Sequence, residues 1–459
     1  MSLKKNDRIT VRIADLNNLG FGVARHEGLA VFVADTVMGD ECEIQIIKVN
    51  KSYAIGKLLR LVAPSVQRTE PRCALSCRAC TYRLISYEDE CLQKKKTVEM
   101  AFRKAGLPEV EIAPLIPSPR LCHYRNKAQY PVAKTKNGVE IGFYAPKTHR
   151  VTEAAACPLA PEIFSEILEV IRAYLTEYDI PIYDEESGKG LVRHIYLRRG
   201  ECSGEILLCL VVTDLSLPMK DALVERICKQ FPAVVGILLN LNDKDTNVIL
   251  GDTYRTLFGR DYIIDTLAGV ELEISAPSFY QINHDATELL YAKARELAKL
   301  TADELLLDLY CGTGSIGLSM ADAASEVIGI EIVPDAVECA RRNAAHAGIQ
   351  NAAFYAADAS DAEKILEGAE AERGESIRPD VVVLDPPRKG STEKLLSFIA
   401  NTLSPSRIVY ISCNPDTLAR DCAFLKTLGY GIGTVTPVDL FPMTGHVESV
   451  VCLKRQIQQ

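Results

Sequence analysis

The chain has 459 residues, of which 47% are hydrophobic and 25% charged, a composition typical of a globular protein with room for two or three domains. No apolar run approaches the ~20 residues that a membrane-spanning helix needs, which excludes a membrane partner. The N-terminal sequence MSLKKNDRIT lacks an apolar signal core, so we expect a cytoplasmic protein. We also expect it to be a monomer. In that compartment, the 15 cysteines favour metal binding, catalysis or burial over a disulfide framework.

The net charge of −9 is distributed unevenly along the chain. Residues 1–150 carry 25 Lys and Arg against 15 Asp and Glu, a net charge of +10, while the remaining residues carry 27 against 46, a net charge of −19. A basic third of this kind can attract a polyanion such as a nucleic acid, although an ordinary solvated surface of uneven composition is the alternative.

Residues 1–62 are expected to form a small closed β-barrel. Five short strands that alternate apolar and polar residues, separated by glycines, are typical of barrels that bind oligonucleotides. The predicted strands are RITVRIADL (8–16), FGVARH (21–26), LAVFVAD (29–35), ECEIQIIKV (41–49) and YAIGKLLRL (53–61). Cations and aromatic rings that could contact such a ligand, with a core position as the alternative for the rings, are Lys4, Lys5, Arg8, Lys48, Lys51, Phe21, Phe32 and Tyr53.

Residues 63–270 are expected to form a central, mixed α/β domain. It begins with a cysteine cluster, Cys73-x3-Cys77-x2-Cys80, followed by a predicted helix over 89–107. Further elements are strands at 127–134, 139–145, 192–200, 205–214 and 233–241, and a helix over 161–178.

Residues 271–459 show the strand–helix alternation of a parallel sheet, so the fold class is α/β with a Rossmann-like C-terminal domain. The β-branched runs VVVLD and IVYIS are typical of strands that are buried on both faces. Strands are expected at 304–309, 326–331, 352–356, 380–385, 407–412 and 446–455.

A glycine loop, DLYCGTGSIG (308–317), follows the first of these strands. Asp308 ends the strand, and Gly312 allows a tight turn and a close approach of backbone to a ligand. The next strand ends in Glu331, where a carboxylate can bind two ribose hydroxyls. We expect CGTGSIG (311–317) to leave no room for a pyrophosphate cradle of the dinucleotide type, and a single acidic strand end follows it. This favours S-adenosylmethionine over NAD, with a purely structural turn as the alternative. These features are typical of class I S-adenosylmethionine-dependent methyltransferases. Other acidic residues that end strands and join this candidate cofactor site are Asp358 and Asp385.

The motif DPPRKG (385–390) places two cations after the prolines. Methyltransferases that act on exocyclic amines usually carry an aromatic residue there, which stacks on the base. Arg388 and Lys389 cannot stack in that way, but they can hold a phosphate or a uracil carbonyl. Surface charge is the alternative reading of both residues.

Cys413 follows the next strand and precedes a predicted helix, a position that is expected to lower the pKa of its thiol. A thiolate is needed for one chemistry in particular, because carbon 5 of uracil accepts a methyl group only after a nucleophile has added to carbon 6. A base must then remove the proton from carbon 5, and Glu448 in PMTGHVES is the candidate. A buried structural cysteine is the alternative.

With these motifs, the chain resembles the RNA uracil-5-methyltransferases over essentially its whole length. The resemblance implies that Gln281 in SFYQINHD and Tyr310 in the glycine loop lie at the cofactor, together with Glu331 and Asp385. It also implies Cys413 as the nucleophile and Glu448 as the base. The family more often has a histidine where Met443 stands, and this departure leaves both catalytic matches intact.

The N-terminal barrel resembles a TRAM domain, which implies the branch of the family that methylates 23S ribosomal RNA. The alternatives are a tRNA uridine-5-methyltransferase that acts on the T-loop, and a non-catalytic RNA-binding assembly protein that retains the fold. The basic residues 1–150 are expected to hold the RNA.

The cysteine cluster resembles the iron–sulfur motif of the same family, with a shorter spacing and Arg78-Ala79 in place of two glycines. The resemblance implies a [4Fe–4S] cluster, with zinc as the alternative and Cys91 as a spare ligand. The four expected ligands are Cys73, Cys77, Cys80 and Cys157.

Overall fold

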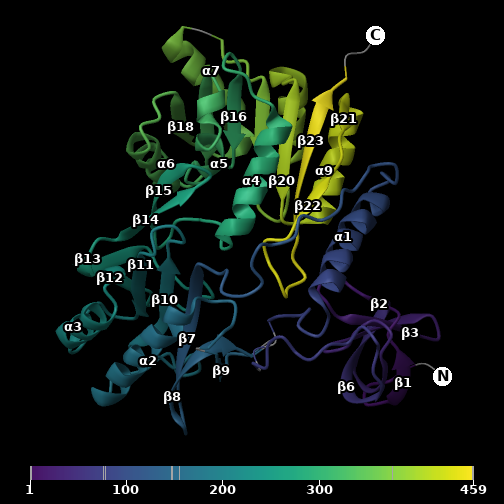
Figure 1. Ribbon diagram of the computed structural model, residues 1–459, viewed down its shortest axis with the longest axis vertical. Helices are drawn as coiled ribbons and strands as arrows, with labels where there is room; N and C mark the ends of the chain where they lie inside the picture. Colours follow the sequence, from purple (N-terminus) through teal and green to yellow (C-terminus); the bar gives the residue numbers. More distant parts are fainter. Residues whose placement is uncertain are drawn as a thin grey trace.

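Four β-sheets follow one another along the chain in the computed structural model, which describes residues 3–75, 77, 79–145, 148–154, 156–374 and 376–456 (Figure 1). Within these residues, no helix is long and apolar enough to cross a membrane.

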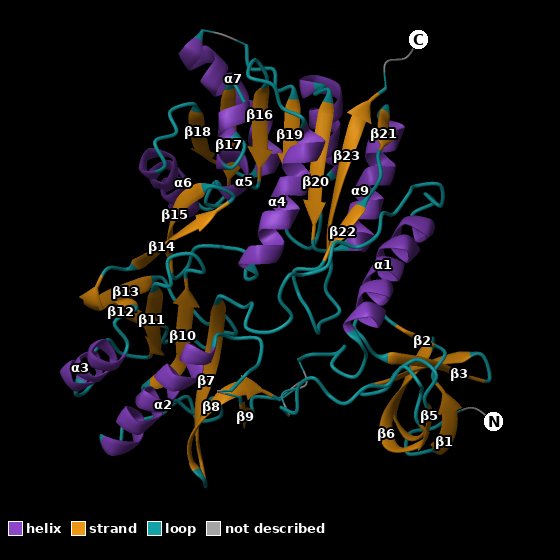
Figure 2. Cartoon of the chain, viewed as in Figure 1, coloured by secondary structure: helices purple, strands orange, loops and turns teal. Residues whose placement is uncertain are grey.

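The N-terminal sheet is a curled, six-stranded sheet in the order β1-β5-β6-β4-β3-β2 (Figure 2). Alternate apolar residues such as Val31, Val33 and Ile44 are fully buried inside it. The predicted strand 8–16 is split into two strands because its first half pairs with β5 and its second half with β3. The strands are β1 (Arg8–Arg12), β2 (Asp15–Leu16), β3 (Gly22–His26), β4 (Leu29–Val33), β5 (Glu41–Val49) and β6 (Tyr53–Ala63).

The central sheet has seven strands in the order β13-β12-β11-β10-β7-β8-β9. Helices α2 and α3 pack against one face. On the other face, Tyr196, Leu207 and Leu238 belong to a core that is shared with the C-terminal domain, which fixes the two domains against each other. The elements are β7 (Lys127–Thr135), β8 (Gly138–Tyr144), β9 (Val151–Glu153), α2 (Glu162–Glu177), β10 (Val192–Arg199), β11 (Ile206–Val212), α3 (Lys220–Gln230), β12 (Val234–Leu241) and β13 (Thr253–Gly259).

A hairpin of β14 (Tyr262–Leu267) and β15 (Val270–Ser275) leads into the C-terminal sheet, whose order is β18-β17-β16-β19-β20-β23-β21. The first five of these strands are parallel, as predicted. Strand β23 is antiparallel to β20, to β21 and to the short β22, which pairs with it outside this order. Helices cover both faces of the sheet (Figure 2). The strands are β16 (Leu305–Leu309), β17 (Glu326–Glu331), β18 (Ala352–Ala356), β19 (Val381–Leu384), β20 (Arg407–Ser412), β21 (Tyr430–Ile432), β22 (Thr436–Val438) and β23 (Glu448–Arg455). The helices are α4 (His284–Ala298), α5 (Ser315–Leu318), α6 (Pro334–His346), α7 (Ala362–Arg373), α8 (Glu393–Phe398) and α9 (Pro415–Thr427).

Helix α1 (Tyr87–Lys104) packs against the C-terminal domain, although its sequence lies between the first two sheets (Figure 1). The side chain of Ser86 caps its start by accepting a hydrogen bond from the Asp89 N–H at 3.0 Å. Val98 and Phe102 are buried in the same core as α9. The chain therefore crosses to the C-terminal sheet and returns before it forms the central sheet, and the division into 1–62, 63–270 and 271–459 stays a prediction.

Candidate active site

The glycine loop leaves open space beside its backbone. After β16, the N–H groups of Tyr310 and Cys311 donate to the Ile330 carbonyl at 3.0 and 3.2 Å. Gly312 then adopts a φ of +55°, and no atom lies within 4 Å of the position that a Cβ on it would take. Its N–H donates to the Glu331 carboxylate at 3.2 Å. The loop and the end of β17 thus lie side by side, and the backbone at Gly312 is open.

Glu331 is held in place from two sides. Its second carboxylate oxygen accepts a hydrogen bond from the Val333 N–H at 2.9 Å. The side chains of Ile332 and Val333 are 58% and 50% exposed, and they offer an apolar surface beside the carboxylate for a planar ring. Sequence reasoning missed this pair, although two aliphatic residues directly after an acidic strand end were the available signal.

Asp308 lies deeper than the sequence suggested. It is fully buried, and one carboxylate oxygen accepts a hydrogen bond from the Gly317 N–H at the start of α5, at 2.9 Å. The other oxygen has no hydrogen-bond partner among the described residues. Burial raises the pKa of Asp308 to about 7. The Asp308 carboxylate therefore fixes the end of the glycine loop from inside the protein, and its contact with a cofactor stays a prediction.

Asp385, Cys413 and Glu448 meet at one edge of the C-terminal sheet. Asp385 follows β19, Cys413 follows β20 and Glu448 begins β23, and these three strands are neighbours. Glu448 is 4% exposed, and burial followed by the charge of Asp385 raises its pKa well above the usual range. Burial also raises the pKa of Asp385 to about 7. Asp385 is half-buried, and two carboxyl groups that interact in this way favour having only one of them ionised.

The expected lowering of the Cys413 thiol pKa is wrong. Burial, followed by the charges of Glu448 and Asp385, raises it to about 11. The hydrogen bond and the charge of Arg388 oppose this shift without cancelling it. A backbone N–H in the first turn of α9 is already paired within the helix, since the Asn414 side chain accepts from the Asp416 N–H at 3.1 Å.

Tyr291 of α4 lies close enough to Asp385, Asp308 and Glu448 for their charges to act on it, and sequence reasoning did not find it. Its hydroxyl hydrogen-bonds the Ser315 hydroxyl at 2.8 Å. Its pKa is raised, mainly by burial and also by the charges of Asp385, Asp308 and Glu448. The neutral phenol therefore bonds the first residue of α5, which follows the glycine loop.

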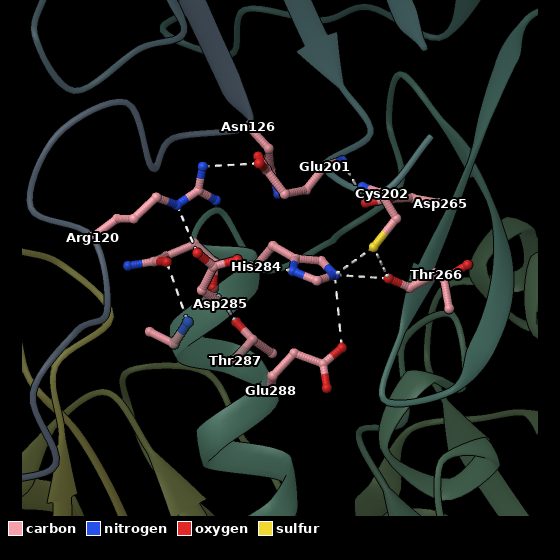
Figure 3. Close-up of polar contacts among 12 residues, drawn as sticks. Arg120, Asn126, Glu201, Cys202, Asp265, Thr266, His284, Asp285, Thr287 and Glu288 are labelled. Atoms are coloured by element: carbon pink, nitrogen blue, oxygen red, sulfur yellow. Dashed lines mark hydrogen bonds and ion pairs between the residues drawn. The ribbon is translucent and has the colours of Figure 1, made fainter. Parts of the chain in front are cut away.

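Gln281 lies in a buried segment that leads into α4. Its backbone carbonyl accepts from the Asn126 side-chain amide at 2.8 Å, and its side chain is mostly buried. Just after it, the carboxylate of Asp285 forms an ion pair with Arg120 at 2.6 Å, and Arg120 also donates to Glu201 at 2.8 Å (Figure 3). The central domain thus fixes the segment that carries Gln281.

His284, the first residue of α4, also helps to fix the segment that carries Gln281. Its Nε2 lies 2.7 Å from the Thr266 carbonyl, 3.6 Å from the Cys202 sulfur and 3.7 Å from a Glu288 oxygen (Figure 3). These contacts connect the first turn of α4 to the β14–β15 hairpin and to the loop after β10.

The two remaining predicted cofactor residues, Tyr310 and Asp358, follow strands β16 and β18. Tyr310 adopts a φ of +65°, and burial raises its pKa. Asp358 is exposed after β18, and its carboxylate accepts from the Ser360 N–H at 2.8 Å, which lowers its pKa. The carboxylate of Asp358 therefore caps the short turn that follows it, residues 359–361.

The four predicted cysteine ligands gather in one neighbourhood. Cys73, Cys77 and Cys80 are buried and Cys157 is partly buried, and burial followed by the charges of Cys73 and Cys157 raises the pKa of Cys80 to about 12. Among the described residues, however, no three Cys, His, Asp or Glu side chains converge as ligands of a metal ion. The predicted cluster or zinc therefore stays a prediction, and we derive no step through either.

The sheet order and the open glycine loop define a class I S-adenosylmethionine-dependent methyltransferase. A family model of tRNA (uracil-5-)-methyltransferases matches residues 238–456, and a model of the TRAM domain matches residues 3–59. The chain belongs to the RNA uracil-5-methyltransferase family and is an S-adenosylmethionine-dependent enzyme of that family.

Full-length relatives support this conclusion. RNA methyltransferases of Clostridium acetobutylicum and Halalkalibacterium halodurans are each 40% identical, over 99% and 98% of this chain and 98% of their own. Among solved structures, the tRNA (uracil-54, C5)-methyltransferase of Pyrococcus abyssi in complex with S-adenosyl-L-homocysteine is similar, with a TM-score of 0.77 and 26% identity. That likeness covers 97% of this chain and 100% of the archaeal one.

Proposed function

We propose that this enzyme methylates carbon 5 of uridine in 23S ribosomal RNA through a transient covalent bond between the Cys413 sulfur and carbon 6. The observation that supports this mechanism is the shared site of Cys413, Glu448 and Asp385, in which both carboxylates raise the thiol pKa. A nucleophile and a base that act in turn on adjacent ring carbons need this closeness.

In the proposed first step, the Cys413 thiol loses its proton to solvent water, and the resulting thiolate sulfur bonds to carbon 6 of the uracil ring. The electron pair of the 5,6 double bond moves toward the ring carbonyl, which makes carbon 5 nucleophilic. Arg388 opposes the rise of the thiol pKa and is the cation that stabilises the thiolate. S-adenosylmethionine, when bound, supplies the methyl group that carbon 5 accepts.

In the proposed second step, Glu448 removes the proton from carbon 5. The 5,6 double bond re-forms, the bond between carbon 6 and the Cys413 sulfur breaks, and the sulfur leaves as a thiolate. A carboxylate whose pKa is raised by burial and by Asp385 is a stronger base than an exposed one, which suits this step.

We propose that the cofactor lies over the open side of the glycine loop. Glu331 and the backbone of Gly312 are the contacts that the loop geometry supports best. The positive sulfonium favours a site with buried carboxylates, because it offsets their mutual repulsion. The other proposed cofactor residues are Gln281, Asp308, Tyr310, Asp358 and Asp385.

The choice of 23S ribosomal RNA rests on the TRAM domain and on the resemblance to the branch that carries it. The second candidate is tRNA, because the likeness to the archaeal tRNA enzyme covers 97% of this chain and so extends into the N-terminal domain. Incubation with each RNA and labelled cofactor separates the two, followed by mapping of the modified uridine. Methylation of tRNA alone overturns the proposal.

The covalent mechanism is tested with two variants. Cys413→Ala should abolish both methylated RNA and the covalent protein–RNA complex, while Glu448→Gln should accumulate that complex on a denaturing gel. Normal turnover by Cys413→Ala would contradict the mechanism, and RNA binding without methyl transfer by the unaltered protein would favour an assembly role.

A [4Fe–4S] cluster or zinc at the four cysteines stays a prediction outside this mechanism. Iron, sulfide and zinc are measured in protein purified without oxygen, with Cys80→Ala as the comparison. A metal content that is the same in both proteins contradicts the prediction.

A further inference from the structure

The residue that we propose as the base begins a strand that returns from a hairpin. Strands β22 and β23 pair in antiparallel register, with Val438 opposite Glu448. Residues 439–447 form the loop between them, which we call the base hairpin. Because Glu448 is the first residue after this loop, the path of the loop sets where the carboxylate of Glu448 lies.

A buried ion network holds the base hairpin. Lys94 of α1 is fully buried, and its Nζ donates to Asp439 at 2.7 Å, to the Phe441 carbonyl at 3.0 Å and to Glu90 at 2.8 Å. Asp439 begins the loop, and its second oxygen accepts from the Tyr87 hydroxyl at 2.9 Å. Lys94 is therefore bonded both to the loop and to the acidic residue of its own helix.

Glu90 extends the network to the middle of the loop. One of its oxygens accepts from the Met443 N–H at 2.6 Å, and the other is paired with Arg72. Met443 has a φ of +69°, a left-handed conformation that is unfavourable for a residue with a side chain. Its carbonyl accepts from the Tyr82 N–H at 3.0 Å, so both backbone groups of the strained residue are fixed from outside the loop.

Other parts of the chain hold the same loop. The Tyr124 hydroxyl donates to the Pro442 carbonyl at 3.0 Å, and the Asn283 side chain donates to the Leu440 carbonyl at 3.0 Å. A Cβ placed on Gly445 would lie 2.5 Å from the Asn18 carbonyl oxygen of the N-terminal sheet. The hydrogen bonds to the Pro442 and Leu440 carbonyls are to backbone groups, so they fix the path of the loop independently of the side chains at these two positions.

We propose that Lys94 is a positioning residue for Glu448, which it holds in place for proton removal through the base hairpin. This inference rests on the proposed role of Glu448. Lys94 neutralises Glu90 and Asp439, two buried carboxylates that each bind the loop. Without the lysine, Glu90 keeps only its ion pair with Arg72, and the buried Asp439 keeps no cation that pairs with it among the described residues. The loop must then shift or one carboxylate must take up a proton.

The test compares the two chemical steps in single-turnover reactions with a uridine-containing RNA and methyl-labelled cofactor. Lys94→Met should slow the release of methylated RNA from the protein by about tenfold or more, because small displacements of a catalytic group are costly. Methyl transfer to the covalent complex should stay within about threefold of the unaltered enzyme, since the hairpin does not carry Cys413. Labelled covalent complex should accumulate.

One further variant is the control for Lys94→Met, and another tests the same contact from the side of the loop. Lys95→Met removes the neighbouring lysine, whose ion pair with Glu99 lies within α1, and should leave the ratio of the two rates unchanged. Asp439→Asn keeps the Lys94–Glu90 pair and weakens only the hold on the loop, so it replaces Lys94→Met if that variant does not fold. Equal loss of both steps, or an unchanged release rate, overturns the inference.

The inference and the proposed function fail in different ways. If neither the unaltered enzyme nor Glu448→Gln forms a covalent complex, the covalent mechanism is wrong. If Glu448→Gln accumulates the complex while Lys94→Met and Asp439→Asn release product at the normal rate, the positioning role alone is wrong.

Discussion

The half-buried Asp385 acts on the buried Glu448, since its negative charge adds to burial in raising the pKa of Glu448. Burial and these two carboxylates also raise the pKa of the Cys413 thiol to about 11. Both proposed catalytic groups must lose a proton before they act, so kcat/KM should rise with pH from roughly 6 to 9. Initial rates of labelled methyl transfer across this range test the prediction, and a flat profile would contradict it.

Asp308 should make the ligand-free protein less stable as the pH rises. Its pKa is raised from 3.8 to about 7 in the folded protein, so the folded state holds a proton that the unfolded state releases. The contribution of that proton to stability is complete below about pH 4 and is lost as the pH rises through about 7. Asp308→Asn removes the buried charge and keeps an acceptor for the Gly317 N–H.

Thermal unfolding without ligand measures this effect. At pH 8, Asp308→Asn should be more stable than the unaltered protein by about 1–3 kcal/mol, and the difference should shrink toward pH 4. Asp358→Asn serves as the control, because the pKa of Asp358 is lowered and its loss cannot stabilise the protein at pH 8. A difference for Asp308→Asn that is independent of pH would show that its charge is not the cause.

Much of the C-terminal sheet could be predicted from the sequence because its central strands are buried on both faces. The runs that contain β16, β19 and β20 are apolar and β-branched, and each is followed by a motif residue. The neighbourhood of Cys413 and Glu448 was not predictable from spacing alone. It depends on the antiparallel insertion of β23 between β20 and β21.

The local sequence around Cys413 also predicted the wrong direction for the pKa shift of its thiol. Its position before α9 indicated a lowered pKa, whereas burial and two carboxylates from other strands set the opposite direction. The Lys94 network was missed for a similar reason. Three consecutive lysines at 94–96 indicate a solvated helix face, and only the packing of α1 against the C-terminal domain buries the first of them.

The basic N-terminal third should make RNA binding strongly dependent on salt, because each phosphate contact releases counterions. We expect the Kd for a ribosomal RNA fragment to rise about 10- to 1,000-fold between 50 and 200 mM salt. Replacing Lys4, Lys5, Lys48 and Lys51 with glutamine should reduce the slope of log Kd against log salt. Filter binding or fluorescence anisotropy measures both quantities.

The matched control for this experiment removes cations from the acidic part of the chain. Lys293 and Lys364 are paired with Glu296 and Asp361 on helices of the C-terminal domain. Their replacement by glutamine should leave the slope unchanged. A slope that is equally shallow for all three proteins would contradict the assignment of RNA binding to residues 1–150.

Gly312→Ala should weaken cofactor binding far more than it weakens the fold. Gly312 has a φ of +55°, so an alanine there is strained and costs about 1 kcal/mol of stability. Its Cβ meets no protein atom within 4 Å, because it projects into the open side of the loop where we propose that the cofactor lies. Calorimetric titration with S-adenosyl-L-homocysteine should show a Kd that is about tenfold higher or more.

Gly348→Ala separates backbone strain from occupation of the site. Gly348 has a φ of +69° and also has no atom within 4 Å of an added Cβ, but it follows the C-terminal end of α6. We expect the same loss of stability, about 1 kcal/mol, with an unchanged Kd. If both variants lose affinity equally, strain transmitted through the fold explains the effect and the cofactor does not lie beside Gly312. If only Gly312→Ala loses affinity, the open side of the glycine loop is the binding surface.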